Sequence, residues 1–425
     1  MSLRQNKAFV APMGRTGSEG CSLMSVLIAT TPKLKSLRVQ NSRGTMELQS
    51  ALEPVAFSRP YMGEAEAQAA ADAVRSGWIV GGPRLADFER RFAAHCGAAH
   101  AIGVSNWTTG AFLALHAWNI GPGDEVIVPS LTFIASVNVI RHVGATPVFA
   151  EIDERTYTID PADVAKKITA RTKAIMPVDQ IGLPCDIDAI TAIASKHGLR
   201  VLDDAACAFG SINRGRPVGS LAEVTVFSLH ARKVVTTAEG GMIVTNNEAL
   251  AHRLRILRHQ GMSASDFARH GARPTEFETY PEIGYNFRIT DIQAAIGLAQ
   301  LDRLDEMLRM RRVAAECYTA GLAGHPFILP PTVPDGLIHN WQSYQVALTP
   351  DAAISRNAVM DRLFDAHIPT RRGVMASHRE PPYTDLHAIL PITERVADTT
   401  FQLPMHSGLT SPQIERVLEE LWRLA

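Results

Sequence analysis

Val224-Thr-Val-Phe-Ser-Leu-His-Ala-Arg-Lys233-Val-Val-Thr-Thr-Ala-Glu-Gly-Gly241 places one lysine between a β-branched run and a pair of glycines. The run Val224–Leu229 predicts a buried strand, with Ser228 near its end, where a hydroxyl can donate to a phosphate. Gly240 and Gly241 allow another part of the chain to approach where a side chain would collide. Most lysines are solvated surface charges. Desolvation at the end of a buried strand favours the neutral amine, so Lys233 is predicted to form a Schiff base with an aldehyde cofactor.

The chain has the composition of an ordinary globular protein. It has 425 residues, 46% of them hydrophobic, and a formal net charge of −1, which is enough for a large domain and a smaller one. Because there is no basic field, we expect small molecules rather than nucleic acid as partners. No apolar run is long enough to cross a bilayer, so no membrane span is predicted.

The five cysteines, at positions 21, 96, 185, 207 and 317, show no close pairing. This spacing predicts neither a disulfide framework nor a CxxC metal site. The sequence also lacks HExxH, a clustered set of His and Cys ligands, and GxSxG, so we expect no metal centre and no serine hydrolase. Reduced thiols favour a cytoplasmic location.

Residues 1–54 are expected to be an N-terminal extension. The first ~45 residues are basic, with Glu19 as their single acid, which faintly resembles a transit peptide. The segment has no helical periodicity, so it is either disordered or precedes the true start at Met24 or Met46. We expect it to be dispensable for activity.

From residue 55 onward, strand-like and helix-like segments alternate. Helices are predicted at Gly63–Gly77 and Leu85–Cys96, and further helices begin near positions 108, 132, 160 and 186. The predicted strands between them are Ala99–Val104, Glu125–Pro129, Pro147–Ile152, Lys173–Val178 and Arg200–Asp203. This alternation is typical of an α/β fold with a largely parallel sheet covered by helices on both faces.

Two further features describe the domain organisation. The strands Val224–Leu229 and Gly241–Thr245 follow each other without room for a crossover helix, so the sheet is predicted to be mixed. One long helix, predicted at Thr290–Ala320, would lead into a smaller domain. We therefore expect a large domain at residues 55–305 and a small C-terminal domain at residues 306–425. Ser263–Pro281 is predicted to be a mobile loop.

Polar side chains follow several predicted strands, where ligands of open α/β sheets bind. Thr108 opens a helix and can face an anion, or it can belong to an ordinary helix cap. Phe133 can cover a flat heterocycle or lie in the core. Asp203 and Asp204 end a buried strand, so one of them should meet a cation unless it caps a helix.

Together these segments resemble the DegT/DnrJ/StrS family of pyridoxal-phosphate-dependent sugar aminotransferases. The resemblance covers roughly residue 55 to the end, with its motifs in the expected order. These motifs are Gly77-Trp78, Gly81-Gly-Pro83, Gly121-Pro-Gly-Asp-Glu-Val126, Pro129-Ser-Leu-Thr-Phe133, Asp204-Ala-Ala206, Phe227-Ser-Leu-His-Ala-Arg-Lys233, Glu239-Gly-Gly241, Gly284-Tyr-Asn-Phe-Arg-Ile-Thr-Asp291 and Thr370-Arg-Arg-Gly-Val-Met-Ala-Ser-His378.

The resemblance implies fold type I of the pyridoxal-phosphate enzymes, the aspartate-aminotransferase-like fold, in which a mixed, mostly parallel sheet forms the large domain and an α+β domain follows. It implies that Lys233 binds pyridoxal 5'-phosphate covalently and carries a proton, and that Asp204 pairs with the ring nitrogen. The other implied cofactor contacts are Phe133 on the ring, the Trp107 amide, Thr108 and Ser228 at the phosphate, and Asn286 from a second subunit of a homodimer with shared active sites.

Two residues depart from the family pattern. Trp107 stands where relatives have a small residue, and Cys207 stands where they have Gln, His or Glu on the cofactor's phenolic oxygen. A thiol is a weaker hydrogen-bond donor. Some relatives replace the lysine with histidine and act as dehydratases, so Lys233 favours transamination.

The resemblance also implies the reaction. An amino group would pass from L-glutamate to a nucleotide-linked keto sugar of the 4-keto-6-deoxyhexose type by a ping-pong mechanism. Arg288, Arg371 and Arg372 could face a diphosphate, and His230 and His378 could touch substrate or be structural. A cyclitol or other keto acceptor and a non-catalytic, regulatory cofactor-binding protein remain alternatives. A nicotinamide-dependent oxidoreductase is disfavoured because the GxGxxG turn is missing.

Overall fold

The computed structural model describes residues 54–264, 273, 275 and 277–425. Apart from residue 54, the expected N-terminal extension lies outside these residues, as does most of the middle of the loop predicted at Ser263–Pro281. In the described part of the chain, no helix is both long enough and apolar enough to cross a membrane.

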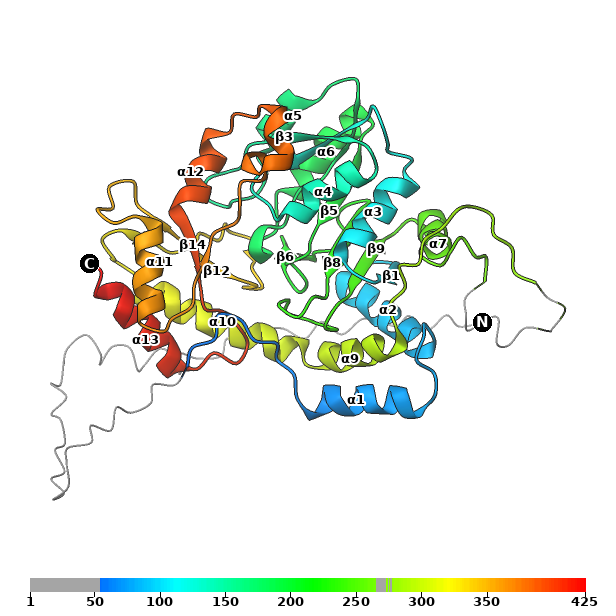
Figure 1. Cartoon of the computed structure of the whole chain (residues 1–425), viewed down its shortest axis with the longest axis horizontal. Helices are drawn as coiled ribbons and strands as arrows, with labels where there is room; N and C mark the ends of the chain where they lie inside the picture. The colour runs from blue at the N-terminus through cyan, green and yellow to red at the C-terminus, as the bar shows by residue number, and fades with distance from the viewer. Residues whose placement is uncertain (1–53, 265–272, 274, 276) are drawn as a thin grey trace, which may run out of the picture. The chain divides into compact units, whose positions relative to one another are not determined.

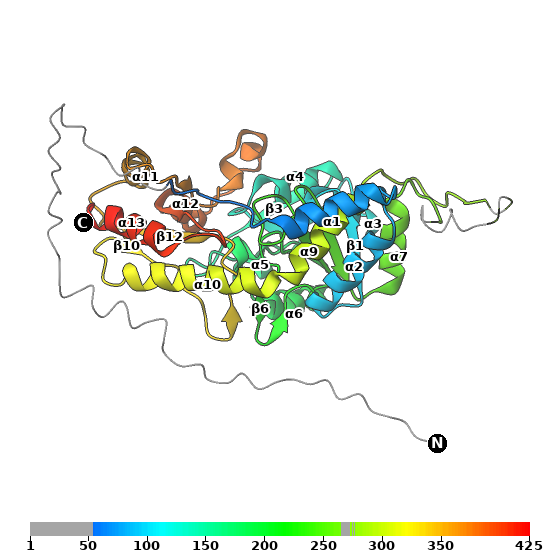
Figure 2. The same ribbon diagram turned by 90° about the horizontal axis from the view of Figure 1, so that it is seen from below.

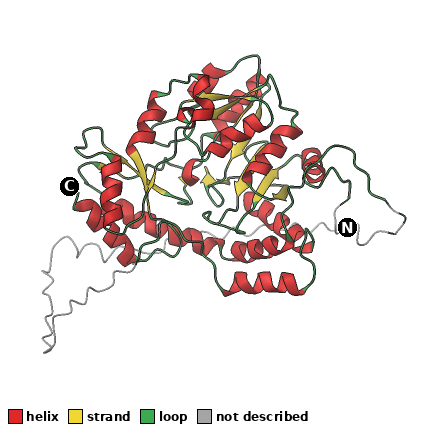
Figure 3. Ribbon diagram, viewed as in Figure 1, coloured by secondary structure: helices red, strands yellow, loops and turns green. Residues whose placement is uncertain are grey.

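A seven-stranded sheet forms the centre of the fold (Figures 1 and 3). Its order is β1-β9-β8-β5-β4-β2-β3. β9 is antiparallel to both neighbours, and the other pairs are parallel. The predicted mixed, mostly parallel sheet is therefore confirmed. The strands are β1 (His100–Val104), β2 (Glu125–Pro129), β3 (Thr146–Ala150), β4 (Thr172–Ile175), β5 (Arg200–Asp204), β8 (Val224–Ser228) and β9 (Gly241–Thr245).

Helices cover both faces of this sheet, as the alternation predicts. Alternate strand residues such as Leu202 and Val201 belong to different core clusters, because successive side chains point to opposite faces. The clusters on one face include α3 (Trp107–Ala117), α4 (Ile134–His142) and α7 (Glu248–Leu257). Those on the other include α2 (Pro83–Cys96), α5 (Pro161–Lys167), α6 (Ile187–His197) and α9 (Asp291–Asp302).

The predicted long helix is wrong in one respect, because it is broken at Arg303. α9 ends at Asp302, and α10 (Leu304–Gly321) begins one residue after the break (Figure 2). The backbone of Arg303 has φ −111° and ψ 8°, outside the helical range. Its guanidinium lies 3.2 Å from Glu66 of α1 (Glu64–Arg75) and over the ring of Tyr61. Helical periodicity carries no signal of these long-range contacts.

A second, antiparallel sheet follows α10 along the chain. Its order is β10-β12-β14-β13, and its core is shared with α10, α11 and α13. This arrangement is α+β, as expected for the C-terminal part, while the boundary near residue 305 stays a prediction. The elements are β10 (Ile328–Leu329), β12 (Tyr344–Leu348), α11 (Arg356–Asp365), β13 (Arg371–Arg372), α12 (Pro391–Thr399), β14 (Thr400–Leu403) and α13 (Ser411–Trp422).

A small third sheet and short 3-10 turns complete the described chain. The small sheet has the order β11-β6-β7 and joins residues that are far apart in sequence. Its strands are β6 (Ile212–Asn213), β7 (Arg216–Pro217) and β11 (Leu337–Ile338), and the turns are η2 (Gln180–Gly182), η3 (Ser377–Arg379) and η4 (Pro381–Leu386).

Candidate active site

Lys233 lies in the loop between β8 and β9, as the opening motif predicts. The loop is closed at its base, since Leu229 N donates to Gly240 O at 2.9 Å. The Lys233 side chain is half-buried, and its Nζ donates to Cys207 Sγ at 3.0 Å. The structure therefore brings together the predicted covalent anchor and one of the two residues that depart from the family pattern.

Asp204 ends β5 and is buried, at 4% exposure. One carboxylate oxygen accepts from Ser136 Oγ at 2.7 Å, and the other accepts from the Ala206 amide at 3.1 Å. Burial raises the pKa of the Asp204 carboxyl to about 6, while the two hydrogen bonds and the charge of Lys233 act in the opposite direction. A cationic ligand group would make the ionised form of this carboxylate much more favourable.

A short hydrogen-bond relay supports Asp204 from α4. Because Ser136 donates to Asp204, its oxygen accepts from Thr132 Oγ1 at 2.9 Å. Phe133 lies between these two residues as the N-cap of α4, and its side chain is 70% exposed. A large aromatic ring left exposed at the start of the helix that supports a buried carboxylate suits the covering of a flat heterocycle. Sequence reasoning missed Ser136, although a buried polar residue on an apolar helix was a signal.

The predicted phosphate-binding residues meet at the N-terminus of α3. Trp107 and Thr108 are its first two residues, so their amides have no intrahelical acceptor. A Cβ on Gly241 would lie 2.8 Å from Trp107 N, which explains why a glycine stands there. Ser228 pairs with Gly241 across β8 and β9. Free amides at a helix N-terminus, next to a serine, are suited to an anion, and we call this group the cradle.

The bulk of Trp107 does not enter this cradle. Its side chain is buried in the core, and its indole Nε1 donates to Val226 O at 3.1 Å. The tryptophan therefore anchors the start of α3 to β8 and leaves its backbone amide at the helix N-terminus.

A segment after β11, which the sequence analysis did not single out, fixes the backbone around Lys233 and Cys207. Asn340 is buried, and its Nδ2 donates to Cys207 O at 2.7 Å and to Phe209 O at 3.0 Å. Gln342 Nε2 donates to Arg232 O at 2.6 Å. One short segment thus holds the backbone of Cys207 and of Arg232, the residue before Lys233.

This segment is itself under constraint. Trp341 has φ +56°, a left-handed conformation that an aromatic residue rarely adopts without support. The buried Arg311 of α10 supplies that support, since it donates to the carbonyls of Trp341 at 3.0 Å and Gln342 at 3.3 Å. Burial lowers the pKa of Arg311 to about 10.

A second buried cluster contains Asp203, the neighbour of Asp204 in β5. Asp179, Cys185 and Asp203 are buried, with ligand-type atoms within 4.8 Å of one another. Asp179 Oδ1 accepts from the Cys185 amide at 2.8 Å, whereas Asp179 Oδ2 and Asp203 Oδ1 have no hydrogen-bond partner in the described chain. Burial raises the pKa of Asp179 to about 7 and that of Asp203 well above its usual range. Of the two neighbouring carboxylates, Asp204 is the one with two short hydrogen bonds and the nearby charge of Lys233, which favour its ionised form.

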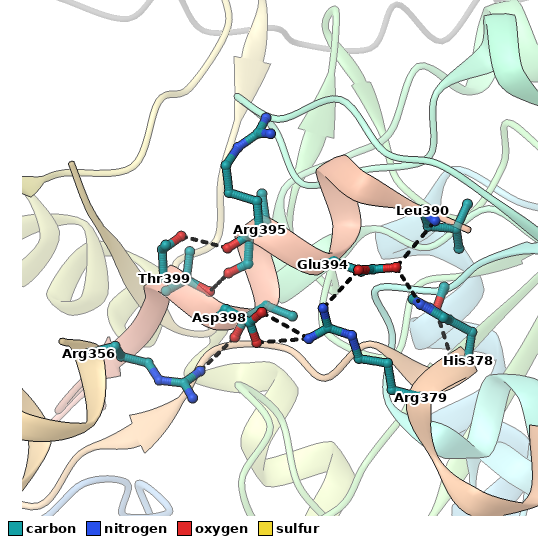
Figure 4. Close-up of polar contacts among 12 residues, drawn as sticks. Arg356, His378, Arg379, Leu390, Glu394, Arg395, Asp398 and Thr399 are labelled. Atoms are coloured by element: carbon teal, nitrogen blue, oxygen red, sulfur yellow. Dashed lines mark hydrogen bonds and ion pairs between the residues drawn. The ribbon is translucent and has the colours of Figure 1, made fainter. Parts of the chain in front are cut away.

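His378 is placed as a structural residue. Its Nδ1 lies 2.6 Å from the buried Ser130 Oγ, and its Nε2 lies 3.2 Å from Glu394 (Figure 4). Glu394 also accepts from Arg379 at 3.0 Å. Both ring nitrogens are used, so the histidine ties the segment before η4 to the β2–α4 loop that carries Phe133. His230 is more exposed and lies 3.8 Å from Glu239.

Three other candidate residues, Asn286, Arg371 and Arg372, make contacts with residues other than Lys233. Asn286 is exposed, and its Oδ1 accepts from Arg288 Nε at 3.0 Å. Arg372 lies 3.8 Å from Glu380, while Arg371 lies over the ring of Phe57. The structure therefore separates the two neighbouring arginines of β13.

The residues present fit pyridoxal phosphate. The half-buried lysine, the oriented buried carboxylate, the open aromatic ring and the glycine-lined cradle match its aldehyde, ring nitrogen, ring face and phosphate, respectively. When bound, this cofactor withdraws electrons from the carbon that carries the substrate's amino group. A mixed α/β sheet with these residues at its strand ends is typical of a pyridoxal-phosphate-dependent aminotransferase of fold type I.

Comparisons with known proteins support this class and narrow it. The model of the DegT/DnrJ/EryC1/StrS aminotransferase family matches residues 60–422. GDP-perosamine synthase from Caulobacter vibrioides is 41% identical over 376 residues, which cover 88% of this chain and 98% of that protein. The chain therefore belongs to the DegT/DnrJ/EryC1/StrS aminotransferase family and is a pyridoxal-phosphate-dependent enzyme.

Solved structures of similar proteins agree with the assigned fold and cofactor. The pyridoxamine-phosphate form of the putative sugar aminotransferase Spr1654 from Streptococcus pneumoniae has a TM-score of 0.82 at 29% identity, covering 87% of this chain and 98% of that one. DesI, solved in the presence of its TDP-sugar product, has a TM-score of 0.79 at 35% identity, covering 87% and 92% of the two chains. The predicted fold and cofactor are both confirmed.

Proposed function

We propose that this aminotransferase moves an amino group from L-glutamate to a nucleotide-linked keto sugar, of the 4-keto-6-deoxyhexose type, by a ping-pong mechanism. The observation that carries the transaminase assignment is the buried Asp204, held by Ser136 and the Ala206 amide, together with the half-buried Lys233. The sugar substrate is supported by the names of the similar proteins, one a GDP-perosamine synthase and the other, DesI, solved in the presence of its TDP-sugar product.

Each residue has a proposed task. Lys233 Nζ holds the cofactor and, once released, moves the proton from the substrate's α-carbon. Asp204 keeps the ring nitrogen protonated, and Phe133 covers the ring. The cofactor phosphate is held by the Trp107 amide and the hydroxyls of Thr108 and Ser228. Cys207 lies beside the lysine amine and would hold the cofactor's phenolic oxygen.

The homodimer belongs to the same proposal. Asn286 is exposed in one copy of the chain, which leaves its amide available to the phosphate of a second copy's site. We propose that the active sites are shared in this way, with residues 55–305 as the cofactor-binding domain and residues 306–425 as the small domain.

The first test is spectroscopic. The protein loaded with pyridoxal phosphate is mixed with L-glutamate, and its visible absorption band is expected to disappear as the cofactor takes up the amino group. Lys233→Ala is expected to abolish the normal rapid conversion. A band that persists with glutamate and every other amino donor would contradict transamination and favour a regulatory, cofactor-binding role.

The acceptor is tested in the second half-reaction. The aminated protein is isolated and offered a nucleotide-linked 4-keto-6-deoxyhexose or a keto cyclitol. We expect the visible band to return with the nucleotide sugar. Recovery only with the cyclitol would leave the aminotransferase assignment intact and replace the proposed acceptor.

A further inference from the structure

Two arginines from distant parts of the chain converge on one aromatic ring. The guanidinium of Arg232 lies 5.5 Å from the centroid of the Phe57 ring, and that of Arg371 lies 5.2 Å from the same centroid. Both arginines are exposed, while Phe57 is half-buried. Each contact is favourable by itself, because the face of an aromatic ring attracts a cation. Two cations held close to one ring nevertheless repel each other.

No carboxylate of the described chain neutralises this pair. Arg371 Nη1 donates to the neutral carbonyl of Thr370 at 2.9 Å, and no ion pair is found for Arg371 or Arg232 among the residues that the structure places. The contrast with Arg372, the next residue of β13, is direct, since its guanidinium faces Glu380 at 3.8 Å. The uncompensated charge is therefore local to Arg232 and Arg371.

The three residues lie on separately anchored backbone. Phe57 O accepts from Met405 N at 3.1 Å, and Arg371 is paired with Gln402 of β14. The carbonyl of Arg232 is held by Gln342. Because Arg232 directly precedes Lys233, this positive group belongs to the same loop as the amine that carries out the reaction. A preorganised pair of guanidiniums is suited to oxyanions such as carboxylate and phosphate.

We infer that Arg232 and Arg371, arranged around Phe57, form a subsite for the oxyanion group of a ligand that reaches Lys233. This inference rests on the proposed function, in which both substrates carry such groups. L-glutamate has two carboxylates, and a nucleotide-linked sugar has a diphosphate. The chemistry of recognition is the same for both, so the source of the anion is decided by separating the two half-reactions.

The experiment compares Arg371→Met and Arg232→Met with Arg372→Met as the matched control. Binding of GDP and of TDP is measured by calorimetry, and the apparent affinity for L-glutamate is measured from the loss of the visible band in the first half-reaction. We expect the Arg371 and Arg232 variants to bind one of these ligands about ten- to hundredfold more weakly, the loss that follows from removing a charged hydrogen-bond donor. The control should stay within about twofold of the wild type.

The two measurements, nucleotide binding and glutamate affinity, identify which substrate supplies the anion. Weaker GDP or TDP binding with unchanged glutamate affinity assigns the subsite to the diphosphate, and the opposite result assigns it to the amino donor. Equal behaviour of Arg371→Met and Arg372→Met in both arms, with an active wild type, would overturn the subsite alone. A wild-type protein that responds to neither glutamate nor nucleotide would overturn the proposed function together with it.

Discussion

Asp203 and Asp204 are neighbours in one strand, yet their surroundings differ completely. Asp204 faces α4 and is met by Ser136, the Ala206 amide and the charge of Lys233. Asp203 points to the opposite face of the sheet, where its nearest donor, Thr225 Oγ1, is 3.5 Å away and one oxygen has no partner in the described chain. Both are buried to a similar degree.

The difference shows that burial alone does not prepare a carboxylate for catalysis. Burial raises the pKa of both carboxyls, and at Asp203 the like charges of Asp179 and Asp204 raise it too, against a single long hydrogen bond from Thr225. The surroundings of Asp203 thus favour its neutral form, whereas those of Asp204 allow it to ionise when a cation arrives. Donors that stabilise the charged form mark the functional residue.

The largest expected effect tests the difference between Asp203 and Asp204 directly. Asp204→Asn should lower the rate of the glutamate half-reaction by about 10²–10⁴-fold, because the ring nitrogen of the cofactor loses its counter-charge. The rate is measured by stopped-flow absorption. Asp203→Asn replaces a neutral acid by a neutral amide of the same shape and should stay within about threefold of the wild type.

A loss of similar size in both aspartate variants would contradict the assignment. It would mean that the half-reaction depends on both carboxylates and not on Asp204 alone. The thermal midpoint of each variant, measured without cofactor, controls for misfolding.

The next effect tests the donor that distinguishes Asp204. Ser136→Ala removes a hydrogen bond to a charged group, which is worth ~1.5–3 kcal/mol, so the half-reaction should slow by about ten- to hundredfold. Thr132→Val removes only the second link of the relay and should cost less. If Thr132→Val were the more damaging change, Ser136 would not be the residue that orients Asp204.

A third prediction concerns Asp179 and the pH dependence of stability without cofactor. Its folded pKa, about 7, lies above the usual 3.8, so between these values the native state binds more protons than the unfolded state. Stability is therefore fully present below pH ~4 and falls as the pH rises toward 7. Asp179→Asn should remove this loss and stabilise the protein at pH 8 by ~1–3 kcal/mol, with little change at pH 4. Thermal unfolding at both pH values checks this, and an equal gain at both would contradict the assignment.

Much of this site follows from sequence because its parts are local. The strand before Lys233, the helix start at Thr108 and the acid at the end of β5 are each encoded within a few residues. The sheet strands were also predicted well, although β4 ends at Ile175 rather than at Val178. Periodicity does not define where pairing between strands stops.

The parts that escaped prediction depend on long-range contacts. The break at Arg303 is stabilised by Glu66, which lies on another helix. The clamp by Asn340 reaches Cys207 across 133 residues of chain. Nothing in the local sequence around Asn340 marks it as different from any other polar residue in a loop.

The smallest expected effect sharpens the comparison between a positioning contact and a merely structural one. Asn340 and Asn213 are equally buried at 3%, and each donates from Nδ2 to the carbonyl of a cysteine, Cys207 at 2.7 Å and Cys185 at 3.1 Å. Replacing either asparagine by alanine leaves a buried carbonyl without its donor and should cost ~1–3 kcal/mol of stability.

Only Asn340→Ala, however, frees the backbone of Cys207, whose thiol accepts from Lys233 Nζ. We expect it to slow the uptake of pyridoxal phosphate by the cofactor-free protein by about threefold, as followed by the growth of the visible band, while Asn213→Ala leaves the rate unchanged. Asn340 also donates to Phe209 O, so the thermal midpoints of both variants are measured beside the rates to separate an effect of position from one of stability. Equal rates would show that the contacts of Asn340 support the fold in the same way as those of Asn213, and that the geometry of Lys233 is set by its own loop.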